Sequence, residues 1–242
     1  MRSHPIVGGL LLAGLLAAAT PAAASGLQIA PTGLQIAPGG PAQALWLTNT
    51  GDRELRAQVR AYRWSQASGK DDLEATQALV ASPPMLNIPA GGRQLVRVIR
   101  TGQDAAAGEQ AFRLLVDELP QGATTTTGVQ YVLRYSVPVF VGAAPASAAA
   151  LQWSSVIDHE QLQLEIRNTG SSHAQISGVA LAPPEGAPVD LVPGLLGYVL
   201  PGATMHWTVS LPAGANPANA RVKALINGEP TDQTLSTGSH AR

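Results

Sequence analysis

A period of two dominates the hydrophobic pattern in the middle of the chain. Apolar side chains occupy every odd position from Val129 to Val141, which is the alternation of an extended strand. Most of these residues are β-branched or aromatic, and such residues favour strands. We therefore predict a long β-strand over 129–141, with its odd-numbered side chains on one face.

The even positions of this predicted strand are mixed, and one of them is Pro138. Proline has no amide proton to donate to a neighbouring strand, so it is found at the edges of sheets. A long apolar edge promotes aggregation, and its presence in a natural sequence favours a surface that pairs with a strand of another chain. The alternative is an ordinary sandwich strand with one face buried in its own domain.

Short strand-like runs separated by turn residues fill the rest of the chain, whereas helical periodicity is scarce. The runs before residue 129 are 27–36, 44–48, 58–64, 94–100 and 111–119. The runs after residue 150 are 151–156, 162–167, 174–180, 205–211 and 221–226. This pattern predicts an all-β protein made of two consecutive β-sandwiches.

The boundary between the two sandwiches is predicted at 142–150, where small residues and one proline are typical of a hinge. The first domain then covers 25–141. The second covers 151–242 and ends in a polar tail.

The first 24 residues have the features of a secretory signal peptide. Arg2 precedes an apolar run from Ile6 to Ala19, and three alanines end at Ala24 before the expected cleavage site. The run is shorter than the roughly 20 residues that span a bilayer, so we expect a cleaved, exported product. The sequence contains no cysteine, which excludes disulfides and thiolate chemistry.

Charge and motif content argue against nucleic-acid binding and catalysis. Removal of residues 1–24 takes Arg2 away and leaves 14 basic and 16 acidic residues, so the mature net charge is −2. A negative net charge argues against binding to the phosphate backbone of nucleic acids. No phosphate-binding loop, nucleophile elbow or zinc-binding helix motif occurs. His159 is expected in a solvated turn, and the isolated His173 and His206 are expected to have surface or packing roles. We predict neither an enzyme nor a cofactor or metal site.

Seven short phrases of the first domain occur in an order that is specific to one family. They are PT (31–32), LTNTG (47–51), RWSQ (63–66), SPP (82–84), GRQLVR (92–97), FRLLVDELP (112–120) and LRYSVPVF (133–140). Together they resemble the PapD-like periplasmic chaperones of chaperone–usher pilus assembly. The phrases ending in DELP and RYSVPVF are most similar to the archaic, Csu-type branch, as are LQW (151–153) and LGYVL (196–200) in the second domain.

The resemblance implies two immunoglobulin-like domains in a boomerang arrangement and a chaperone function in the periplasm. Chaperones of this family lend the last strand of the first domain to an incomplete pilus subunit, and an outer-membrane usher then exchanges that strand for the next subunit's extension. This donor-strand complementation is a form of β-augmentation. The strand around Val129–Val141 corresponds to the lending strand, so Val129, Tyr131 and Leu133 are expected to fill the subunit's groove, with Tyr135 extending the set.

One departure from the family concerns the anchor for the subunit's C-terminal carboxylate. Family members use two basic residues in the interdomain cleft, but the corresponding positions here are Gly33 and Pro138. Arg134 and Arg113 are candidate substitutes, because a guanidinium can bind a carboxylate through two hydrogen bonds. The alternative is that both are exposed strand arginines that aid solubility.

Two further positions are assigned structural roles by the resemblance. Arg97 corresponds to a buried arginine of the family, and Glu109 corresponds to a carboxylate at the domain interface. A solvent-exposed salt bridge is the alternative for these residues.

Two other functions and one further partner remain open from the sequence. A secreted pilin or adhesin-type β-sandwich subunit would be a single sandwich preceded by an alternating extension, and no such extension follows Ala24. A carbohydrate-binding or enzymatic sandwich would need aromatic platforms or carboxylate pairs on loops. A free edge strand could also pair with a second copy of the chain.

Overall fold

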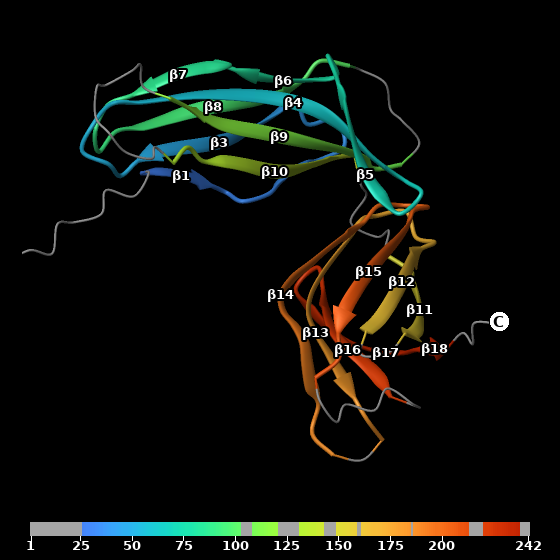
Figure 1. Cartoon of the computed structure of the whole chain (residues 1–242). Coiled ribbons are helices and arrows are strands. Elements are labelled where there is room, and N and C mark those ends of the chain that lie inside the picture. The colour runs from blue at the N-terminus through green and yellow to red at the C-terminus, as the bar shows by residue number, and fades with distance from the viewer. Residues whose placement is uncertain are drawn as a thin grey trace, which may run out of the picture.

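The protein is all-β. The computed structural model describes residues 26–102, 108–120, 131–142, 149–158, 161–184, 186–212 and 220–237. Within these ranges eighteen strands form four sheets (Figure 1). No helix in the described residues is long and apolar enough to cross a membrane. The prediction of an all-β, two-domain immunoglobulin-like fold is confirmed.

Strands before residue 142 form the first sandwich. One sheet has the order β1 (Leu27–Ala30), β3 (Ala42–Asn49), β8 (Arg93–Arg100), β6 (Leu79–Ser82). The other has the order β2 (Leu34–Ile36), β10 (Arg134–Val141), β9 (Gln110–Leu119), β4 (Leu55–Ala67), β5 (Lys70–Ala75), and β7 (Met85–Ile88) also pairs with β4. Alternation along each strand turns one set of side chains inward, so Leu45 and Val96 of the first sheet share a core with Val59 and Leu114 of the second.

Strands after residue 150 form the second sandwich. One sheet has the order β15 (Thr204–Ser210), β12 (Gln161–Asn168), β11 (Leu151–Asp158), β18 (Ser236–Thr237). The other has the order β14 (Val189–Val199), β13 (Ala174–Ala182), β16 (Arg221–Ile226), β17 (Glu229–Thr234). The strict alternation of exposed and buried residues along β12 shows how a period of two builds this core.

The two sandwiches meet end to end at an elbow (Figure 1). Trp64 at the end of β4 and Phe140 at the end of β10 belong to the first domain, yet both are buried against the core of the second. The β4–β5 hairpin also reaches across, because the Gln66 side chain donates to the Tyr198 carbonyl (2.9 Å) and accepts from the Leu200 amide (2.8 Å). These contacts make the elbow a packed interface.

Several sequence-based predictions fall partly or wholly outside the described residues, among them the solvated turn at His159. The signal peptide at 1–24 lies outside them, and so does most of the hinge at 142–150, since 143–148 are not described. The strand predicted over 129–141 is shorter in the described part of the chain: β10 begins at Arg134, Val129 is not described, and Tyr131 to Leu133 precede the strand.

Candidate functional site

The strand β10 is paired differently along its two halves. Val139 to Val141 lie between two strands, since they pair with β9 and also, in parallel, with β2. Arg134 to Pro138 pair with β9 alone. The free edge extends upstream of the strand, because the Glu118 amide still donates to the Leu133 carbonyl at 2.9 Å. Sheet hydrogen-bonding groups on this side are therefore available to an added strand.

The odd-numbered apolar residues divide in the same way. Val137, Val139 and Val141 are at most 1% exposed and belong to the first domain's own core. Tyr131 is 80% exposed, and Leu133 is partly exposed. Exposed large apolar side chains beside an open strand edge are typical of a surface that binds another chain.

Tyr135 lies at the boundary between the two halves and differs from our expectation. Its ring packs against the first domain's core, and its hydroxyl donates to the Leu27 carbonyl at 2.6 Å. Leu27 belongs to β1 in the opposite sheet, so Tyr135 links the two sheet edges. Tyr135 thus contacts the first domain itself, and its part in binding another chain stays a prediction.

Arg113 on β9 lies at the elbow, between aromatic rings of both domains. Its guanidinium carbon is 3.7 Å from the Trp64 ring centroid and 5.1 Å from that of Tyr198. No ion pair to Arg113 is found among the described residues, and burial lowers the pKa of its guanidinium. The acid closest to it electrostatically, Asp71, already accepts hydrogen bonds from the Trp64 indole and the Gln66 amide. A half-buried cation without an ion-pair partner is suited to binding an anion.

Gly33 and Pro138, the two uncharged positions at which the resemblance leads us to expect basic residues, lie beside this arginine. A Cβ atom at Gly33 would be 3.6 Å from the Pro138 ring, so the two positions are neighbours in space. Pro138 is also directly opposite Arg113 in the register of β10 and β9. A guanidinium therefore lies one strand away from the place where the basic pair is missing.

Arg134, the second candidate anchor, is engaged elsewhere. It forms an ion pair with Asp117 at the opposite end of β10 from the cleft, and Arg60 contacts the same carboxylate at 2.6 Å. Burial opposes ionisation of Asp117, but the hydrogen bonds from Arg134 and Arg60 outweigh it, so the pKa of this carboxyl lies below its usual value. Arg134 is therefore held in an ion pair within the first domain's sheet, at the end of β10 away from the elbow, and its role as an anchor stays a prediction.

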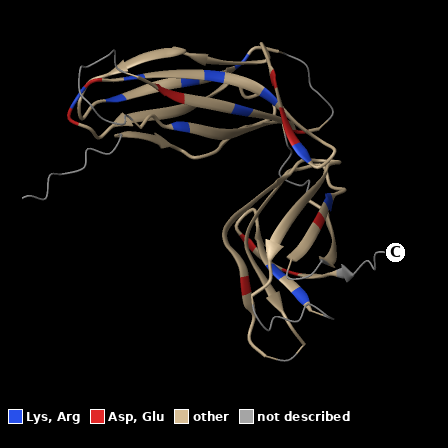
Figure 2. Cartoon of the chain, in the orientation of Figure 1, with Lys and Arg blue, Asp and Glu red and all other residues tan. Residues whose placement is uncertain are grey.

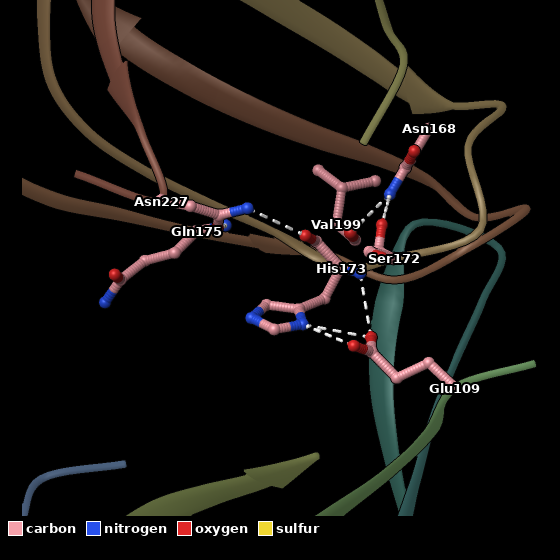
Figure 3. Close-up of polar contacts among 7 residues, drawn as sticks. All are labelled: Glu109, Asn168, Ser172, His173, Gln175, Val199 and Asn227. Atoms are coloured by element: carbon pink, nitrogen blue, oxygen red, sulfur yellow. Dashed lines mark hydrogen bonds and ion pairs between the residues drawn. The ribbon is translucent and has the colours of Figure 1, made fainter. Parts of the chain in front are cut away.

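Arg97 and Glu109 differ in placement. Arg97 is exposed in the middle of β8, because neighbours at Val96 and Val98 take the inward positions, and the expectation of a buried arginine is wrong. Glu109 lies at the elbow, and its side chain is only 1% exposed. Its carboxylate accepts a hydrogen bond from the His173 amide (2.8 Å) and lies 2.9 Å from the His173 ring (Figure 3).

Sequence reasoning missed the role of His173. An isolated histidine between Ser172 and Ala174 gives no signal of an interdomain contact, because its partners Glu109 and Phe140 are more than thirty residues away. Tyr198 belongs to the LGYVL phrase, but its position beside Arg113 was not predictable without the elbow.

Charge on the first domain is distributed and not gathered into one basic surface. Figure 2 shows Lys and Arg positions on several of its strands, with acidic positions among them. In the described ranges, no group of three or more His, Cys, Asp or Glu side chains is arranged to hold a metal ion. The candidate site is therefore built from the half-buried Arg113 and the free half of β10.

Comparison with known proteins assigns this architecture to a family. The model of the family described as pili and flagellar-assembly chaperone, PapD N-terminal domain, matches residues 26–147, just over half of the chain. A search of curated proteins found no match.

Several solved structures share the two-domain fold. One is from the complex of CsuC with the tip adhesion subunit CsuE of the archaic Csu pili of Acinetobacter baumannii, with 24% identity, a TM-score of 0.65, and 88% of this chain and 99% of that chain covered. The E. coli chaperone DraB has 15% identity and a TM-score of 0.58 over 88% and 98% of the chains. The Pseudomonas aeruginosa chaperone CupB2 has 17% identity and a TM-score of 0.59 over 86% and 100%.

Proposed function

We propose that this chain, which belongs to the PapD family of pili and flagellar-assembly chaperones, captures pilus subunits in the periplasm by lending them its strand β10 and delivers them to an outer-membrane usher. Family members act in assembly and not in catalysis, which agrees with the absence of catalytic motifs from the sequence. Solved relatives include CsuC with a tip adhesion subunit and SafB with the SafA pilin, and both support a pilus subunit as the partner.

The observation that carries this proposal is the half-open edge of β10. Arg134 to Pro138 have a neighbouring strand on one side alone, and the exposed Tyr131 and the partly exposed Leu133 lie just upstream on the same edge. An incomplete sandwich could pair its own edge strand here through backbone hydrogen bonds. Tyr131, Leu133 and the undescribed Val129 would cover its open core, and each fully buried aliphatic side chain contributes about 1.5–3 kcal/mol.

Arg113 is the residue that we propose as the anchor for the subunit's C-terminal carboxylate. Its guanidinium is held by contacts with Trp64 and Tyr198, so its orientation is fixed before a partner arrives. Since it lies opposite Pro138 across β9 and β10, a carboxylate bound to it would also lie next to the lending strand. Two hydrogen bonds from the guanidinium would set the register of the captured subunit.

The lending strand is tested by Leu133→Asp, with Val132→Asp as the matched control. Both residues precede β10 and both are at least partly exposed, but they lie on opposite faces of the extended chain. A carboxylate at 133 would enter the dry groove of the subunit, so we expect at least about tenfold less subunit co-purifying with the tagged chain from the periplasm. The Val132→Asp variant should retain most of its capture.

Circular dichroism of the purified variants distinguishes lending from a simple core role. A folded Leu133→Asp variant with reduced capture supports the proposal. A variant that unfolds would show that Leu133 belongs to the chain's own core, and a folded variant with normal capture would exclude 133 from the contact. Either of the last two results contradicts the lending role.

The anchor is tested by comparing Arg113→Gln with Arg134→Gln. Glutamine keeps the length and polarity of the side chain but removes the charge that a terminal carboxylate requires. We expect Arg113→Gln to reduce capture of a subunit with its natural C-terminus, and to have little effect on a subunit whose C-terminus is amidated. Arg134→Gln should leave capture within about twofold of the unaltered chain, because a surface pair contributes little. Equal capture by both variants would eliminate Arg113 as the anchor.

A further inference from the structure

The end of strand β10 is held by a histidine of the second domain. The imidazole of His173 stacks on the ring of Phe140, with 3.3 Å between ring centroids and an interplanar angle of 3°. Phe140 is the residue before the last in β10. The second domain therefore contacts the proposed lending strand directly.

A carboxylate from the neighbouring strand holds the same histidine. Glu109 lies directly before β9, and the next residue, Gln110, pairs with Val141 of β10. Both oxygens of the Glu109 carboxylate are 2.9 Å from His173 Nδ1, and one of them also accepts from the His173 amide (Figure 3). Stacking and hydrogen bonding thus act on one imidazole from two adjacent strands.

The backbone on both sides of His173 is fixed within the second domain. The Asn168 side-chain amide donates to the carbonyls of Ser172 (2.7 Å) and Val199 (3.0 Å). Asn227 donates to the carbonyl of His173 at 3.1 Å (Figure 3). Three side-chain hydrogen bonds therefore tie the segment that carries the imidazole to the rest of the second domain.

Protonation changes the strength of both contacts in the same direction. A neutral imidazole can donate one hydrogen bond from Nδ1, whereas the imidazolium adds a positive charge opposite the buried Glu109 and over the face of Phe140. The other titratable groups facing this ring are Tyr198, at 6.3 Å between centroids, and Arg113 beyond it, over the Tyr198 ring. Histidine is the side chain whose charge ordinarily changes between about pH 5 and 8.

We propose that His173 is a positioning residue that fixes the end of β10 against the second domain, and that it does so more firmly when its ring is protonated. The inference rests on the proposed function, because the position of β10 matters to a partner only if β10 is the strand that is lent. The clamp itself is a property of the free chain, so it can be measured without a subunit, and its failure would be distinct from a failure of capture at Leu133.

The test uses distances between spin labels on the two domains. The chain contains no cysteine, so Gln43→Cys on β3 and Lys223→Cys on β16, both exposed, can be labelled without background. We expect the distance distribution of the full mature chain to narrow between pH 8 and pH 5.5. Hydrogen exchange over β10 should show protection at Val141 that rises about fivefold over the same interval, since a charged hydrogen bond is about 1 kcal/mol stronger than a neutral one.

Three variants make the result specific to His173. His173→Gln retains a hydrogen-bond donor but does not titrate, and Glu109→Gln retains the acceptor but not the charge, so both should lose the pH dependence while remaining folded. His206→Gln is the comparison for the other histidine at the domain boundary: His206 pairs with Glu165, its side chain is 56% exposed, and its ring lies beside Gly69 of the first domain. This variant should keep the pH dependence if His173 is its source. The proposal would be overturned if the spin-label distance distribution and the Val141 protection factor of the unaltered chain did not change with pH. It would also be overturned if they changed equally in His173→Gln.

Discussion

The two halves of β10 continue one apolar alternation but lie in different surroundings. Val137, Val139 and Val141 fill the first domain's core. The stretch from Val139 to Val141 also has a paired strand on each side, β9 and β2. Tyr131 and Leu133 follow the same period, yet they precede the strand and are partly or largely exposed. A period of two therefore specifies which side chains share a face, whereas the neighbouring strands decide whether that face serves this chain or another one.

The largest effect is expected from a charge in the buried half. Val139→Asp would place a carboxylate at a fully buried position without a hydrogen-bond partner, which costs several kcal/mol. Since single domains are stable by about 5–15 kcal/mol, we expect the first domain to be largely unfolded. Circular dichroism and thermal melting of the purified variant measure this directly.

The comparison with Leu133→Asp provides the control for this effect. The same substitution six residues upstream should leave the melting temperature within a few degrees, because Leu133 is not part of the core. If both variants unfold, the two halves do not differ. If neither does, the buried half is less important to the domain than its packing indicates.

The fold class was predictable from the sequence because alternation and turn residues are local signals. The edge position of β10 followed in part from Pro138, which lies in the half that β2 leaves uncovered. Where β10 begins was not predictable, since the apolar period continues through Tyr131 and Leu133 without a break. The start of β10 is set by its pairing with β9, which the hydrophobic pattern does not show.

The candidate site was less predictable, because it depends on how the domains meet. Arg113 and Arg134 are equivalent in a sequence pattern: each is a strand arginine among apolar residues. The elbow places Tyr198 and Trp64 around Arg113. The pairing of β9 with β10 brings Asp117 to Arg134. His173 carried no signal because both of its partners come from the other domain.

A smaller effect is expected at Tyr135, where the two halves join. Tyr135→Phe removes the hydroxyl that donates to the Leu27 carbonyl and leaves the ring in place. We expect a loss of about 0.5–1.5 kcal/mol in unfolding free energy, measured by urea denaturation, with unchanged subunit capture. Reduced capture with unchanged stability would instead move the boundary downstream and assign Tyr135 to the exposed set.

The smallest effect concerns the ion pair that holds the free half of β10 to its own sheet. The pKa of Asp117 lies below its usual value because hydrogen bonds from Arg134 and Arg60 outweigh the opposing effect of burial. A carboxyl with a lowered folded-state pKa binds protons more tightly in the unfolded chain, so its stabilisation is fully present above the unfolded pKa of about 4 and is lost as the pH falls through the lower folded value.

Asp117→Asn tests this contribution because it removes the charge while keeping the side chain's shape. Both arginines are substantially exposed, so the pair should contribute about 1 kcal/mol or less. Urea denaturation from pH 6 to pH 2.5 should show a steeper loss of stability below pH 4 for the unaltered chain than for Asp117→Asn. Hydrogen exchange at Tyr135, whose amide faces β9, should accelerate in the variant while exchange at Val139 stays unchanged, since only the first half of the strand depends on this pair. Equal acceleration at both residues would show that β10 opens as a single unit, and the distinction between its halves would then apply to burial but not to stability.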